Sequence, residues 1–177
     1  MKKVILILLV LSICFSVCSC VTVDEPSKEK QGTSEKNQET EKNETKEEIF
    51  GLNETAVFNT LKFTATELKE TNGTQFFKPE SGNVFVGIKF TVENISEEEQ
   101  NVSSILLFDA YSDDIKTDYS FSAVCAFDSE TLDGALAPGK KIVGWYAVEI
   151  PSSWANIELD VKSDWLSNST AKFVFTK

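Results

Sequence analysis

Apolar and polar residues alternate along the chain from residue 49 onward with the period of a β-strand. The clearest case is the segment 84–93, where one set of alternate positions is wholly apolar: Val84, Val86, Ile88, Phe90 and Val92. The positions between them carry polar residues or glycine, with one apolar exception at Phe85. Because strand side chains point alternately to opposite faces, the pattern predicts a strand with one face in a core and the other, with Gly87 and Lys89, toward solvent.

Similar runs recur to the C-terminus and are separated by turn-forming pairs such as Asn72-Gly73 and Pro138-Gly139. Besides 84–93, we predict strands at 55–58, 61–68, 102–111, 119–127, 141–150, 156–161 and 171–176. Seven to eight short strands with no helical period between them indicate an all-β, antiparallel β-sandwich. Residues 49–177 are numerous enough to enclose one hydrophobic core without disulfides or metal ions.

The N-terminus has the pattern of a targeting segment. Lys2 and Lys3 precede an apolar run at 4–17, whose 14 residues fall short of the ~20 needed for a helix to cross a bilayer. The run ends in Val17-Cys18-Ser19-Cys20. We therefore predict a signal peptide at 1–19 that is cleaved before Cys20.

A small residue directly before a cysteine resembles the lipobox of bacterial lipoproteins. The resemblance implies that Cys20 receives a diacylglyceryl group and further acyl chains such as palmitate, and becomes the first residue of the mature protein. Two acyl chains anchor a protein stably, which would place this one on the outer face of the cell membrane. Ordinary secretion and an uncleaved membrane helix are the alternatives.

The segment 20–48 is predicted to be a disordered, charged linker. From Asp24 to Glu48 it contains no aliphatic or aromatic residue, and it carries nine acids and five lysines. Such a stretch cannot bury enough apolar surface to offset its loss of conformational entropy. A lone helix is the alternative, since Asp24 and Lys28 are spaced four apart, but a helix that is polar on every side has nothing to pack against.

Several short motifs resemble the immunoglobulin-like domain of Gram-positive lipoproteins that is known as domain of unknown function 4352. They are Phe77-Lys78-Pro79, Thr91-Val92-Glu93-Asn94, Leu136-Ala137-Pro138-Gly139 and Val148-Glu149-Ile150-Pro151. The resemblance spans roughly residues 53–157, and the wider group includes a small secreted mycobacterial immunogenic protein. It implies an immunoglobulin-like fold and an extracellular location. The chain departs from the family at 112–115, where Asp113-Asp114 replaces a familiar glycine.

Composition argues against several functions. The formal net charge is −11, every one of the 17 basic residues is lysine, and histidine is absent. An acidic chain without arginine argues against binding to DNA or RNA, and the lack of histidine removes the commonest general base and metal ligand. With Cys14 and Cys18 removed and Cys20 lipidated, Cys125 would be the one cysteine in the folded part, so neither an intradomain disulfide nor a zinc site is expected. We predict no cofactor and no catalytic residues.

Two candidate sites remain. Glu98, Asp113 and Asp114 lie in acidic loops that could bind calcium, although the spacing of a dedicated calcium loop is missing and solvated carboxylates are the simpler interpretation. Trp154 and Trp165 could offer exposed rings to a ligand, whereas Trp145 falls within a predicted strand and is expected to pack in the core.

These observations favour a non-enzymatic surface module that binds another protein or a cell-envelope polymer. The alternative is an accessory or chaperone-like subunit of a membrane system that captures an extended chain at a sheet edge. An envelope hydrolase is a third possibility, for which the sequence offers no located site.

The anchor can be tested by replacing its thiol. Cys20→Ser should abolish labelling with radioactive fatty acid and move the protein from the membrane fraction to the medium or to an unprocessed precursor. Labelling that persists in this variant but is lost in Cys18→Ser would show that the cleavage site is misplaced.

Overall fold

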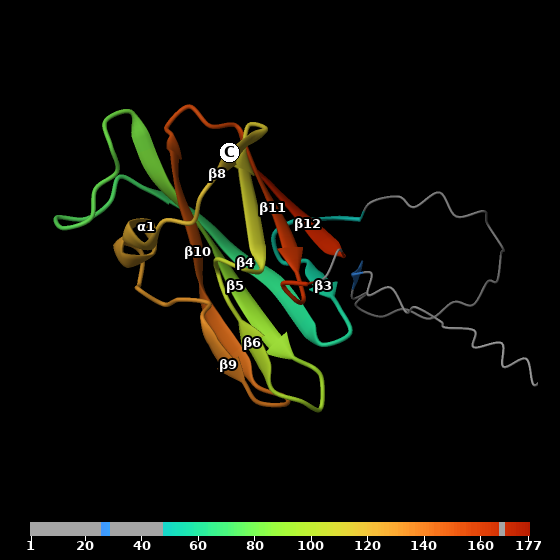
Figure 1. Cartoon of the computed structure of the whole chain (residues 1–177). Helices are drawn as coiled ribbons and strands as arrows, with labels where there is room; N and C mark the ends of the chain where they lie inside the picture. The colour runs from blue at the N-terminus through green and yellow to red at the C-terminus, as the bar shows by residue number, and fades with distance from the viewer. Residues whose placement is uncertain (1–25, 29–47, 167–168) are drawn as a thin grey trace, which may run out of the picture.

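In the computed structural model the chain forms two facing β-sheets, and the structure describes residues 26–28, 48–166 and 169–177 (Figure 1). Sheet A has the order β1 (Ser27–Lys28), β3 (Thr55–Val57), β4 (Leu61–Thr71), β5 (Asn83–Asn94), β10 (Lys141–Pro151). Sheet B has the order β2 (Ile49–Phe50), β12 (Thr170–Thr176), β11 (Asn156–Lys162), β7 (Phe108–Ser112), β8 (Ile115–Thr117). A two-stranded ribbon, β6 (Gln100–Val102) with β9 (Gly134–Leu136), and the helix α1 (Phe121–Ala126) complete the domain.

The predicted β-sandwich is confirmed, and nearly all strand pairs are antiparallel. The exception is β2, which runs parallel to β12 and pairs Phe50 with Phe173. No helix within the described ranges is long and apolar enough to cross a bilayer.

Aromatic rings join the two sheets across the core. Phe90 on β5 lies with its ring centroid 5.4 Å from that of Phe108 on β7 and 5.3 Å from that of Phe173 on β12. Phe63 on β4 adds an edge-on contact with Phe108 at 5.9 Å. Aromatic pairs in such geometries contribute about 0.5–1.5 kcal/mol each beyond the area that they bury, so these side chains fix how the sheets face each other.

The expectation that β5 has one solvent-facing side is wrong. Its outer face carries Phe85, which packs in a second cluster with Trp145 of β10 and with Ala123 and Val124 of α1. Lys89, expected in solvent, is half-buried with its amine 5.4 Å from the centre of the Trp145 ring. The alternation did not predict this layer, because Gly87 and Lys89 face the rings of Phe127 and Trp145 although neither residue counts as apolar in the pattern.

The predicted strand at 119–127 is also wrong, because it is largely replaced by α1. The helix begins after Ser120, whose side-chain oxygen accepts a hydrogen bond from the Ala123 N–H at 3.2 Å. A serine cap of this kind satisfies one of the free N–H groups at a helix start. Cys125 therefore lies on a helix, as a half-buried free thiol, and not in a strand.

The predicted strand at 102–111 is interrupted by a loop. Residues 100–102 belong to β6 and the sheet strand β7 starts only at Phe108. The intervening loop at 103–107 places Ile105 and Leu106 in solvent, because a run of consecutive apolar residues cannot turn all of its side chains to one face.

Residues 112–115, where the sequence lacks the glycine of the motifs that it resembles, form a tight hairpin between β7 and β8. Ser112 pairs with Ile115, and the two residues between them both have positive φ, 48° at Asp113 and 67° at Asp114. Two left-handed residues in a two-residue loop are typical of a type I′ turn, and aspartate tolerates that conformation better than most residues. The carboxylate of Asp113 also accepts hydrogen bonds from the N–H groups of Ala155 and Asn156.

Ser27 and Lys28 form β1 at the edge of sheet A. The prediction that the linker is disordered throughout residues 20–48 is therefore wrong at these two residues. Lys28 pairs with Ala56, and its amine lies 3.1 Å from both carboxylate oxygens of Glu54 and 5.2 Å from the centre of the Phe50 ring. The pKa of Glu54 is lowered, first by the Gly51 N–H that donates to it and then by Lys28. The predicted signal peptide 1–19, Cys20 and most of the linker, residues 21–25 and 29–47, lie outside the described residues.

Gly87 tests the packed outer layer of sheet A. A Cβ added at Gly87 would lie 2.6 Å from Cε2 of Phe127, so Gly87→Ala must displace that ring and should lower the free energy of unfolding by ~1–3 kcal/mol. Gly51→Ala is the matched control, because the nearest atom to its added Cβ is at 3.6 Å. Equal urea-unfolding midpoints for both variants would contradict a packed layer over β5.

Candidate functional site

A cleft of about 340 Å³ opens where the chain passes from sheet B to the edge of sheet A. Its walls come from the 103–107 loop, from β7 and β8, and from β10 behind them. Tyr119 forms an isolated bridge with Val148 of β10, so the segment after β8 closes one side. The lining residues are Ser104, Ile105, Phe108, Asp109, Ala110, Lys116, Thr117, Asp118, Tyr119 and Tyr146.

Stacked aromatic rings form the floor of the cleft. The ring of Tyr146 stacks on that of Phe108, with centroids 5.0 Å apart and an interplanar angle of 23°. The ring of Tyr119 is tilted against Tyr146, with centroids 5.6 Å apart. Burial raises the pKa of both tyrosines, more strongly for the deeper Tyr146. Both phenols are therefore neutral at physiological pH and offer hydroxyl groups, not charges.

The polar wall of the cleft is an ion-pair cluster around Asp109. Lys116 and Lys162 donate hydrogen bonds to its two carboxylate oxygens, at 3.0 and 2.9 Å. These contacts lower the pKa of Asp109, with Lys162 as the larger cause. The carboxylate is thus ionised and already engaged, which favours a structural and electrostatic role in the wall of the cleft.

Ser104 is held in place from the opposite side. Its N–H and hydroxyl donate to the two carboxylate oxygens of Asp133, at 2.8 and 3.1 Å. This contact fixes the start of the 103–107 loop, so the loop is pre-ordered beside the cleft. Pre-ordered loops lose less conformational entropy when they bind.

An exposed apolar side chain lies at the mouth of the cleft. Ile105 lines the cleft and is 72% exposed. Soluble domains often expose single apolar residues, but this one borders an aromatic floor. A hollow with an apolar rim and a few polar groups is the usual form of a binding site.

The candidates from the sequence lie elsewhere. Trp154 is only 3% exposed, and its indole N–H donates to Glu70 at 2.7 Å, so its ring is not the exposed surface that was expected. Trp165 is 65% exposed, in the loop after β11. Trp145 packs in the outer cluster of sheet A and not between the sheets.

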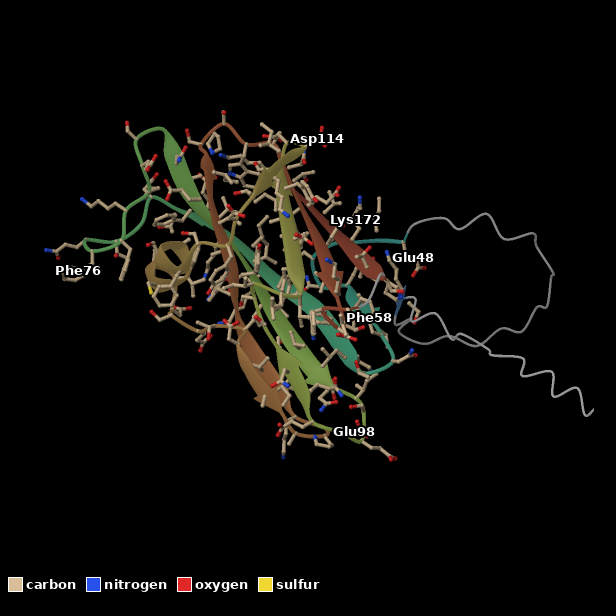
Figure 2. All side chains as sticks on the ribbon, in the orientation of Figure 1. Glu48, Phe58, Phe76, Glu98, Asp114 and Lys172 are labelled. Atoms are coloured by element: carbon tan, nitrogen blue, oxygen red, sulfur yellow. The ribbon has the colours of Figure 1, made fainter. Side chains whose placement is uncertain are left out.

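The calcium candidates are not brought together. Figure 2 shows Asp114 and Glu98 at opposite ends of the molecule, and Asp113 is occupied by backbone N–H groups. Among the residues that the structure describes, no group of three or more acidic or cysteine side chains is placed to hold a metal ion.

Sequence reasoning missed the residues of the cleft. Tyr119 and Tyr146 are far apart in the chain and meet only because the segment after β8 crosses to the edge of sheet A. One signal was available: the run Ile105-Leu106-Leu107-Phe108 has too many consecutive apolar residues for a half-buried strand.

The chain belongs to the family described as domain of unknown function DUF4352, whose match covers residues 50–172. No curated protein matches it in sequence. The expected family is thereby confirmed, although the family itself has no described function.

Solved structures share the fold at low sequence identity. The yjhA protein of Bacillus subtilis is 18% identical, with a TM-score of 0.57 over 71% of this chain and 97% of that protein. An uncharacterised β-sandwich protein of Clostridium difficile 630 is also 18% identical, with a TM-score of 0.51 over 78% of this chain and 99% of the other. The candidate lipoprotein ycdA of Bacillus subtilis is 13% identical, with a TM-score of 0.56 over 67% of this chain. The match spans only 37% of the length of ycdA.

The Asp109 cluster predicts a pH dependence. Because its pKa is lower in the folded protein than the ordinary value near 3.9, its ion pairs stabilise the fold above that value. This stabilisation is lost as the pH falls through the folded pKa. The free energy of unfolding, measured with urea between pH 7 and pH 2, should therefore fall less steeply with decreasing pH in Asp109→Asn than in the wild type. Identical slopes would contradict the described ion pairs.

Proposed function

We propose that this protein is a lipid-anchored binding module on the outer face of the cell membrane, and that its cleft receives a projecting apolar or aromatic side chain of an envelope protein. The observation that carries the proposal is the position of the exposed Ile105 at the mouth of a cleft floored by Tyr146 and Phe108. The lipobox pattern at Cys20 supports the anchor, as does the description of its structural neighbour ycdA as a candidate lipoprotein.

The dimensions and chemistry of the cleft support a side chain as its occupant. About 340 Å³ lies at the small end of the roughly 300–1,000 Å³ that is typical of ligand pockets. An aromatic floor with an apolar rim matches the anchor residues that dominate protein interfaces. The hydroxyl groups of Tyr119 and Thr117 can pair with polar groups of the partner's backbone.

The alternative, capture of an extended chain at a sheet edge, is less well supported. The outer edge of β10 is already engaged, because Ser120 donates its N–H to the Ala147 carbonyl at 2.8 Å and the Trp145 N–H is donated to Glu130 at the same distance. At the opposite edge of sheet A, β1 covers β3. The edge strands of sheet B, β2 and β8, have only two and three residues. Short or covered edges are poor templates for an added strand.

Binding is proposed in preference to catalysis because of the state of Asp109, one of the two carboxylates that line the cleft. Asp109 is engaged by two lysines, whereas a general acid or base needs a free proton site within reach of a substrate.

We expect that the rim of the cleft contributes most of the free energy of binding to the envelope partner. Ile105→Asp places a charge where an apolar partner side chain would enter, and should weaken the retention of the envelope partner on the immobilised full-length protein at least tenfold, about 1.4 kcal/mol. Since Ile105 is exposed, the fold should be unchanged by circular dichroism.

Phe76→Asp is the matched control. Phe76 is 84% exposed in the loop between β4 and β5 and is not among the residues that line the cleft. Retention that is lost in Phe76→Asp and kept in Ile105→Asp would move the binding surface to that loop and reject the cleft.

A further inference from the structure

One end of sheet B exposes large apolar side chains that neither the core nor the cleft uses. Leu106 lies just before β7, Trp165 and Leu166 lie just after β11, and Ile49 starts β2; all four are more than half exposed. We call these four residues the apolar end. They share this end because Lys162 donates its N–H to the Leu107 carbonyl at 2.9 Å, and because Ile49 pairs with Lys172 near the start of β12.

The strand β1 brings the N-terminal part of the chain to the same side of the sandwich. Ser27 and Lys28 pair with β3 at the edge of sheet A, and the amine of Lys28 lies over the ring of Phe50. Phe50 is the neighbour of Ile49 on β2, so β1 and the apolar end adjoin the same edge. Figures 1 and 2 show β1 and Glu48 on one side of the molecule, opposite Phe76.

The length of chain between Cys20 and β1 is short. Ser27 follows Cys20 by seven residues, which can span at most ~25 Å. A domain of the size of residues 49–177 has a radius of gyration of about 14 Å, hence a diameter of roughly 36 Å. With β1 docked, a lipid on Cys20 therefore keeps this edge closer to the membrane than the domain is wide.

We propose that the apolar end rests on the lipid surface, with Trp165 and Leu166 at the level of the head groups. This inference rests on the proposed lipid anchor at Cys20. Tryptophan is enriched at membrane interfaces, because its large ring is apolar and its N–H is polar. Leu166, Leu106 and Ile49 add apolar area on the same side.

Apolar contact drives this association, since charge does not favour it. The nearby cations are already paired, Lys28 with Glu54 and Lys172 with Glu158, and the chain is acidic overall. Four apolar side chains bind a bilayer weakly by themselves, but the anchor holds them at a high effective concentration. The lipid surface is accordingly a contact of the anchored protein and not of the free domain.

Quenching of tryptophan fluorescence by lipid tests the contact. Full-length lipidated protein is reconstituted in phosphatidylcholine vesicles with and without brominated acyl chains, which quench only rings close to the lipid. Trp145 and Trp154 are buried in the domain, so we expect clear quenching, most of which is lost in Trp165→Phe. Trp154→Phe is the matched control and should keep the quenching. Absence of quenching in the wild type, or quenching that survives in Trp165→Phe, would overturn the proposal.

A second variant tests the role of β1. Lys28→Glu sets two carboxylates against each other at Glu54 and should release β1, reducing the quenching at least twofold. Unchanged quenching would overturn the orienting role of β1.

The same vesicles separate this inference from the proposed anchor. If the full-length protein does not float with the vesicles, the anchor at Cys20 fails and the lipid contact fails with it. If the protein floats but Trp165 is not quenched, only the lipid contact is overturned. Protection of Trp165 from aqueous iodide in native membranes, without quenching by brominated lipid, would show that a protein covers the apolar end instead.

Discussion

The ring of Phe108 connects the core of this domain to its cleft. On one side it meets the rings of Phe63 and Phe90 between the sheets, and on the other it stacks on Tyr146. The 103–107 loop precedes this side chain in the chain, and Asp109 and the β7–β8 hairpin follow it. The floor of the cleft is therefore continuous with the hydrophobic core.

The second constraint is the burial of β5 and β10 on both faces. The layer formed by α1 and Phe127 covers the outer face of sheet A, with Gly87 leaving room for the Phe127 ring. To reach that layer, the chain must cross from β8 to the edge of β10, and the crossing places Tyr119 above Tyr146. The same crossing engages the edge of β10. One structural requirement thus closes a sheet edge, where strands could otherwise be added, and builds one wall of the cleft.

The parts of the fold that depend on local alternation could be predicted, and the parts that depend on crossings could not. The inner face of β5, from Val84 to Val92, follows from the period of two. The outer layer does not, because Gly87 and Lys89 face aromatic rings although neither is an apolar residue in the pattern. The helix at 121–126 was missed because its apolar residues, Ala123, Val124 and Cys125, fit a strand as well as a short helix, and the Ser120 cap is a weak signal. Tyr119 and Tyr146 come together only through the topology, so no spacing rule could have identified the cleft. The candidates Trp154 and Trp165 differ in exposure because one of them has Glu70 within reach, a contact between residues 84 positions apart.

The claim that most needs a direct test is that the cleft contacts a partner in the envelope. A photoreactive benzoylphenylalanine can replace Ile105 in the full-length protein, and in a separate experiment Phe76, and cells can be irradiated intact. We expect one discrete crosslinked species from position 105, which disappears when Thr117→Asp, a substitution in the lining of the cleft, is added to the same chain. A discrete species from position 76 and none from position 105 would contradict this claim.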